Sequence, residues 1–132
     1  MNKMIVSSIA AIALTAIPSF AHHGTGQSYD NKKVVEARGT VKEFRWRNPH
    51  CELVLDSKDE NGKVLSISIE MGSPGQLVMT GMTRNTFKPG DEVILKVHPS
   101  FVNPGSGVKI DGPVWVNGKE IPLTPRRGLE AE

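Results

Sequence analysis

The segment HCELVLDSKDENGKVLSISIE, residues 50–70, constrains the fold more than any other part of this 132-residue chain. On both sides of Asn61-Gly62, apolar residues alternate with polar ones, and a period of two indicates a strand with one buried face. Asn-Gly is the preferred dipeptide of a type I′ hairpin turn. The segment therefore predicts an antiparallel hairpin with one face in the core. The apolar positions are Cys51, Leu53, Leu55, Leu65, Ile67 and Ile69.

The segment VVEARGTVKEFRWRNPH, residues 34–50, reads as a longer strand whose alternation slips by one residue. Val41 has the same parity as the apolar residues before it, whereas Phe44 and Trp46 have the opposite parity. If all three face inward, a β-bulge near Lys42-Glu43 must shift the register and bend the strand. A glycine at mid-strand, Gly39, would ease this curvature. A long bent first strand is what a small closed barrel requires.

The rest of the chain predicts one short helix and two further strands. In GSPGQLVMTGMT (72–83), Ser73 suits an N-cap, Pro74 the first helical turn and Gln76 a capping box, and Gly81 can end the helix. Residues 86–99 open with a Lys-Pro-Gly-Asp turn and run into a strand, and residues 108–123 follow as a broken fifth strand with a second Asn-Gly turn at 117–118.

This order predicts a mainly β protein, a small five-stranded OB-like Greek-key barrel with one short helix between strands three and four. A two-sheet sandwich is the alternative. The lone helix before the fourth strand, and a length of 111 residues once residues 1–21 are removed, favour the barrel.

The first residues predict export. An uncharged run, Met4–Ile17, follows one lysine, and Pro18, Ser19 and Ala21 match a signal-peptidase site. The run is shorter than the ~20 residues of a membrane span. We expect a signal peptide at 1–21, cleavage after Ala21, and a periplasmic or secreted protein without a membrane span. The expected domains are an N-terminal arm at 22–33, the barrel at 34–123 and a disordered tail at 124–132.

Charge and cysteine content narrow the possible partners. Loss of Lys3 from 16 Lys and Arg leaves 15 against 14 Asp and Glu, which argues against a nucleic-acid partner. Cys51 is the one cysteine, so no internal disulfide can form. Its parity places it in the core, as is usual for a free cysteine.

His22 and His23 would begin the mature protein. Cleavage after Ala21 frees an α-amino group whose pKa, about 7.7–8.0, allows a metal to displace its proton at neutral pH. The amine and imidazole of His22 can then form a chelate ring, and His23 offers a second imidazole. Nitrogen donors of this kind suit Cu(II). An unselected terminal sequence is the alternative.

His50 and His98 are the other two histidines. His50 follows the Asn48-Pro49 turn, in the loop between the first two strands, which commonly meets ligands in OB barrels. It is the third candidate ligand, and an exposed loop histidine is the alternative. His98 ends the fourth strand, with outward parity, so it ranks below His50 as a weaker candidate.

Several motifs together resemble a large family of small exported bacterial proteins, catalogued as a domain of unknown function. They are the His-His pair and the segments GTVKEFRWRNPH, DENGKV, SPGQL and TFKPGDEV, spread over residues 22–98. The resemblance implies an envelope protein with a small β-barrel and no established activity. It points to His22, His23 and His50 and does not extend to His98.

Three functions fit these observations. The first is a non-catalytic periplasmic copper-binding protein that uses the processed N-terminus. The second is an OB-type module that binds a small ligand, an oligosaccharide or another envelope protein. The third is an oxidative copper enzyme, for which the sequence identifies no substrate surface.

Overall fold

The structure, a computed structural model, describes residues 28–124. The expected signal peptide, His22, His23 and residues 125–132 lie outside the described part. In chain order the elements are β1 (Val35–Arg45), β2 (Glu52–Lys58), β3 (Val64–Glu70), α2 (Pro74–Met79), β4 (Glu92–Pro99), β5 (Ser106–Lys109), β6 (Trp115–Val116) and β7 (Lys119–Glu120).

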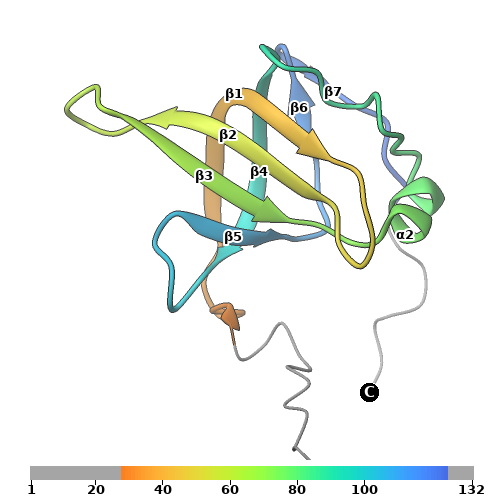
Figure 1. Ribbon diagram of the computed structural model, residues 1–132, viewed down its shortest axis with the longest axis horizontal. Helices are drawn as coiled ribbons and strands as arrows, with labels where there is room; N and C mark the ends of the chain where they lie inside the picture. Colours follow the sequence, from red (N-terminus) through yellow and green to blue (C-terminus); the bar gives the residue numbers. More distant parts are fainter. Residues whose placement is uncertain (1–27, 125–132) are drawn as a thin grey trace, which may run out of the picture.

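The strands form a closed five-stranded barrel with α2 between β3 and β4, as the sequence predicts (Figure 1). Strands β1, β2 and β3 pair antiparallel in sequence order. The ring then closes through a parallel β3–β5 pair and the antiparallel pairs β5–β4 and β4–β1. This closure is that of an OB-type barrel. The short β6–β7 hairpin extends the sheet from β4.

Strand β1 contains the predicted bulge. Val41 pairs with Leu55 and Glu43 with Val54, so Lys42 is the extra residue. Val41 is buried, whereas Phe44 and Trp46 are half-buried and pack against the core rather than within it. Their rings lie 5.7 Å apart, and Phe44 also meets Phe87 edge-on at 5.0 Å. The slip in the sequence pattern was therefore a bulge, and the aromatic residues cover the core at this point.

Gly39 permits the close crossing of β1 and β2. A Cβ atom at this position would lie 2.6 Å from the carbonyl oxygen of Asp56 and 3.0 Å from Cβ of Leu55. Such distances are too short for ordinary contacts, and the backbone atom cannot rotate away. Strand β1 can thus pass from its pairing with β4 to its pairing with β2.

The hairpin between β2 and β3 forms as predicted, but its turn is not type I′. That turn needs positive φ at both central residues, and here Gly62 has φ 77° while Asn61 does not have positive φ. The N–H of Gly62 donates to the carbonyl of Asp59, whose side chain accepts from the N–H groups of Asn61 and Lys63. The result is a three-residue loop. The second Asn-Gly turn has φ 50° at Asn117 and 79° at Gly118, as type I′ requires.

Helix α2 begins and ends as the sequence predicts. Ser73 and Gln76 form the capping box, and Pro74 occupies the first turn. At the other end Gly81 has φ 94°, and the N–H groups of Gly81 and Met82 donate to the carbonyls of Val78 and Leu77. The helix thereby turns Leu77 into the core.

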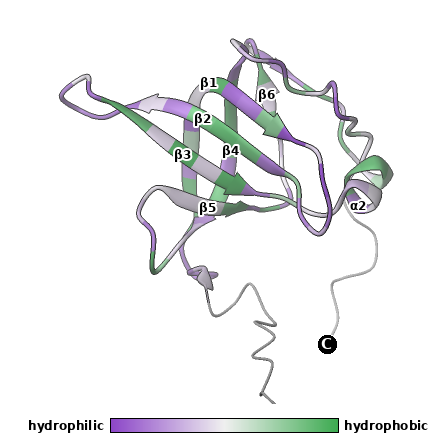
Figure 2. Cartoon of the chain, in the orientation of Figure 1, coloured by the Kyte–Doolittle hydropathy of each residue, from purple (hydrophilic) through white to green (hydrophobic). Residues whose placement is uncertain are grey.

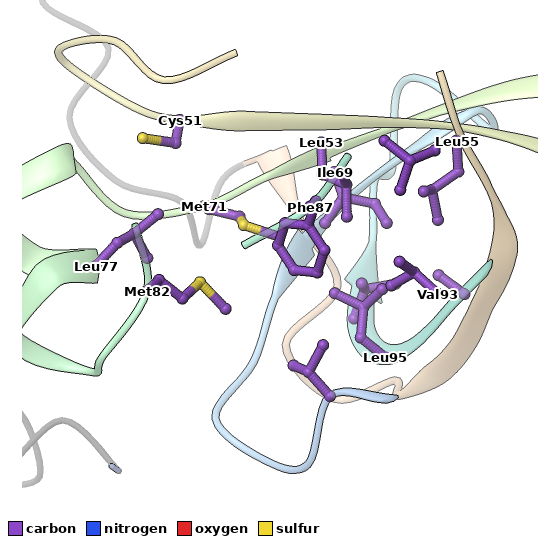
Figure 3. Close-up of a cluster of buried hydrophobic side chains, with 14 residues drawn as sticks. Cys51, Leu53, Leu55, Ile69, Met71, Leu77, Met82, Phe87, Val93 and Leu95 are labelled. Carbon is purple, nitrogen blue, oxygen red and sulfur yellow. The ribbon is translucent and has the colours of Figure 1, made fainter. Parts of the chain in front are cut away.

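The core joins side chains from β1–β4 with Leu77, Met82 and Phe87 (Figure 3). Cys51 is fully buried in it, as expected. Leu65 differs from its expected inward role: it is 43% exposed, because the β2–β3 hairpin extends beyond the barrel (Figure 1). Figure 2 shows the hydrophilic tip of this hairpin.

Candidate functional site

His50 lies in the loop between β1 and β2, with half of its side chain exposed. Two backbone hydrogen bonds hold the next residue, Cys51. Its N–H donates to the carbonyl of Gly72, and its carbonyl accepts from the N–H of Met71. These bonds extend the β2–β3 ladder beyond the Glu52–Glu70 pair. His50 therefore leaves the sheet at a defined point, beside Glu70.

Glu70 binds two groups that are distant in sequence. Its Oε1 lies 3.1 Å from Nδ1 of His50, and its Oε2 accepts a 2.7 Å hydrogen bond from the hydroxyl of Tyr29. Tyr29 is buried, and burial together with Glu70 raises the pKa of its phenol above the usual value of 10.0. One carboxylate thus links the loop before β2 to the segment before β1.

The segment around Tyr29 is held against the barrel by backbone hydrogen bonds. Tyr29 forms a β-bridge with Ser100, the N–H of Asp30 donates to the carbonyl of Pro99, and the N–H of Phe101 donates to the carbonyl of Ser28. Figure 1 shows this segment beside the end of β4 and the loop that leads to β5. The described chain therefore begins next to the residues that contact Glu70.

A polar hollow of about 510 Å³ lies at this place. It is open to solvent, and charged and polar side chains supply much of its wall. Its lining residues are Tyr29, Arg47, Pro49, His50, Cys51, Glu52, Ser68, Glu70, Asn103 and Ser106.

The two glutamates of the hollow have different partners. Glu52 is 2.7 Å from Arg45, 3.8 Å from Arg47 and in close contact with the hydroxyl of Ser68. The Ser68 hydrogen bond, followed by Arg45, lowers the pKa of Glu52. Among the described residues, the carboxylate of Glu70 contacts His50 rather than a lysine or arginine. Glu70 is thus the carboxylate free to orient His50.

This arrangement leaves His50 suited to bind a metal through Nε2. Histidine ligands commonly donate their other ring N–H to a carboxylate, which fixes the tautomer and makes the binding nitrogen more basic. Within residues 28–124, however, no group of three or more His, Cys, Asp or Glu could hold a metal ion. A metal at His50 would therefore need ligands from outside this part of the chain.

The structure separates His98 from this site. Its Nδ1 lies 2.7 Å from the carbonyl oxygen of Lys33, and it does not line the hollow. His98 thus helps to hold the chain just before β1.

Met71 and Met82 are buried in the core, whereas Met79 is 79% exposed on α2.

Sequence reasoning missed Glu70 and Tyr29. A signal for Glu70 was present, because the apolar faces of the hairpin match when Leu53 lies opposite Ile69, and this register places Glu52 opposite Glu70. No local pattern indicated Tyr29, whose contact with Glu70 spans 41 residues of sequence.

The fold and the hollow define a class: small closed OB-type barrels with a polar, histidine-bearing hollow at one end. The chain belongs to the family described as "Family of unknown function (DUF6152)", which matches residues 10–109. This confirms the resemblance to a domain of unknown function. No curated protein and no solved structure matches the chain significantly. Along residues 28–124, no helix has the length and apolar character needed to cross a membrane.

Proposed function

We propose that this protein is an exported, non-catalytic copper-binding protein of the cell envelope. Its site would combine the N-terminal amine and imidazole of His22 with the imidazoles of His23 and His50. One observation carries the proposal: Tyr29 and His50 contact the two oxygens of the same Glu70 carboxylate. The chain that leads to His22 and His23 therefore starts beside His50.

The length of the intervening chain permits this meeting. Four residues lie between His23 and Ser28, the first described residue, and the five Cα–Cα steps span at most about 18 Å. The backbone bonds of Ser28 and Asp30 hold the start of the described segment, and Tyr29 between them lines the hollow. Gly24 and Gly26 in the connecting residues allow tight turns of the backbone.

The donor set favours copper. A neutral amine and neutral imidazoles are nitrogen donors, and among divalent first-row metals such donors bind Cu(II) most tightly. The carboxylate of Glu70 supports His50 as an orienting partner. Cys51, one residue away, stays in the core, so the site would lack a thiolate. This set is suited to holding Cu(II).

Electron paramagnetic resonance of Cu(II)-loaded mature protein tests the proposal. We expect one bound Cu(II) with a spectrum typical of several nitrogen donors. His50→Ala should change this spectrum because it removes one donor. His98→Ala is the matched control and should leave it unchanged, because His98 bonds Lys33 instead. A spectrum of aqueous copper would contradict a metal site, and a spectrum that is identical in His50→Ala would remove His50 from it.

A further inference from the structure

A second hollow lies over the outer face of the bent strand β1 and shares no lining residue with the hollow at His50. Its volume is about 570 Å³. It lies between the end of β2 and the turn of the β6–β7 hairpin. Its lining residues are Glu36, Arg38, Gly39, Thr40, Asp56, Ser57, Lys58, Glu92, Val93, Ile94, Trp115 and Gly118.

Trp115 gives this hollow an aromatic wall. Arg38 lies opposite Ile94, and Ile94 lies opposite Trp115, so the three side chains form a row across β1, β4 and β6. Trp115 is 40% exposed, which is a large apolar surface for a side chain beside polar neighbours. The row offers one flat apolar surface and, at its other end, a guanidinium.

Hydrogen bonds hold the backbone next to the aromatic wall. The side chain of Asn117 accepts a 2.9 Å hydrogen bond from the N–H of Glu92 and donates a 3.0 Å bond to Asp91. The type I′ turn at Asn117-Gly118 and the β4–β6 pairing add backbone constraints. These bonds fix the backbone that carries Trp115 at the edge of the hollow.

Three of the charged groups of the hollow already have partners, one pair within it and one carboxylate with residues outside it. Arg38 lies 3.1 Å from Glu36, and Asp56 accepts a 3.0 Å hydrogen bond from Ser66 and lies 3.9 Å from Lys42. Three carboxylates and two cations line the hollow in total. This balance would not attract a polyanion such as a nucleic acid. It does offer donors and acceptors side by side for a neutral polar ligand.

We propose that this hollow is a binding site for a neutral oligosaccharide. The apolar face of one sugar ring would stack on Trp115, and hydroxyl groups of the neighbouring sugars, which extend along β1, would bond Arg38, Glu36 and Thr40. A flat apolar surface bordered by a few polar groups is the usual composition of a small-ligand site. The site goes beyond the proposed copper function and does not depend on it.

Nuclear magnetic resonance of the mature protein tests this site, because the chain has two tryptophans and hence two indole N–H signals. The probes are chitotetraose, maltotetraose and cellotetraose, each titrated separately. We expect at least one of them to shift the Trp115 signal progressively and leave that of Trp46 in place. Trp115→Ala should weaken binding about tenfold, which is the contribution of one aromatic stack. Trp115→Phe should weaken it less, because a ring remains.

The control is Phe101→Ala, which removes another exposed aromatic side chain, 63% exposed against 40% for Trp115, that does not line this hollow. Oligosaccharide affinity should be unchanged in this variant, and thermal unfolding should show that all the variants are folded. Failure of all three sugars to shift the Trp115 signal would overturn the proposal. So would equal affinity in a folded Trp115→Ala protein, or a shift of Trp115 by a short single-stranded oligonucleotide alone.

Discussion

Glu52 and Glu70 lie directly opposite each other on β2 and β3, a placement that is unfavourable for two like charges. Each carboxylate is stabilised separately: Glu52 by Ser68 and Arg45, and Glu70 by Tyr29 and His50. This division makes the two residues unequal. Glu52 belongs to a structural ion-pair network, whereas Glu70 joins the N-terminal segment to His50.

The titration of the Tyr29 phenol reports on the contact between the N-terminal segment and Glu70. Burial and Glu70 raise the pKa of its phenol, so the stability it contributes is present below about pH 10 and is lost as the pH rises above that value. Tyr29 is the one tyrosine of the chain, so phenolate absorbance measures it alone. We expect ionisation at a higher pH in native than in urea-unfolded protein.

Glu70→Gln is the matched variant for this titration. The amide oxygen still accepts the hydrogen bond, but the negative charge is gone, so the native titration should move back toward that of unfolded protein. Part of the rise should remain, because burial is its largest cause. Identical native and unfolded titrations in the wild type would contradict the contact.

The lowered pKa of Glu52 predicts that the protein loses stability in acid. Ser68 and Arg45 lower its pKa from 4.5, so the stability it contributes is present above that value and is lost as the pH falls through the native pKa. In urea unfolding, the wild type should lose more stability between about pH 5 and pH 3 than Glu52→Gln does. Other carboxylates titrate in both proteins, so the difference isolates Glu52. Parallel pH profiles would show that Glu52 is not stabilised as described.

At the scale of the elements, the two Asn-Gly turns show how register overrides turn preference. A two-residue loop at Asn61-Gly62 would pair Glu60 with Lys63, and hence Leu53 with Glu70. That register would set an apolar residue against a charged one on the same face. The structure instead pairs Leu53 with Ile69, and the loop takes one more residue. The β6–β7 turn carries no such conflict and is type I′.

The close approach of β1 to β2 at Gly39 predicts that a larger residue at this position would destabilise the barrel. Gly39→Ala should lower the free energy of unfolding by about 1–3 kcal/mol, because the new Cβ would meet the backbone of Asp56. Gly75→Ala, in helix α2, is the control: no atom lies within 4 Å of its added Cβ. It should leave stability unchanged or raise it by up to about 1 kcal/mol. Equal effects in urea denaturation would mean that Gly39 does not limit the crossing.

At the scale of the whole molecule, much of the fold followed from local patterns. The slip at Lys42-Glu43, the capping box at Ser73 and the position of one helix were sufficient to predict the barrel and its order of elements. The overhang that exposes Leu65 was not predictable in this way, because it depends on the length of the hairpin relative to the barrel.

The candidate site followed from the sequence only in part. The Asn48-Pro49 turn, with His50 directly after it, indicated His50 as a candidate ligand. Its partner Glu70 needed the hairpin register, and Tyr29 needed the docking of a segment that carries no strand pattern. Which polar residues meet depends on contacts between residues far apart in sequence. The local alternation of apolar and polar residues in a single sequence does not reveal such contacts.

The proposed copper site depends on the free amine of the processed N-terminus, and a competition titration with Cu(II) tests this dependence. Intact mass should first show that the exported protein begins at His22. Mature protein should then bind one Cu(II) at least about a hundredfold more tightly than protein with a Gly-Ser extension before His22, because an amide nitrogen keeps its proton and is a poor donor. His50→Ala should weaken binding less than the extension does, because it leaves the His22 chelate intact. Equal affinity of mature and extended protein would contradict an N-terminal copper site.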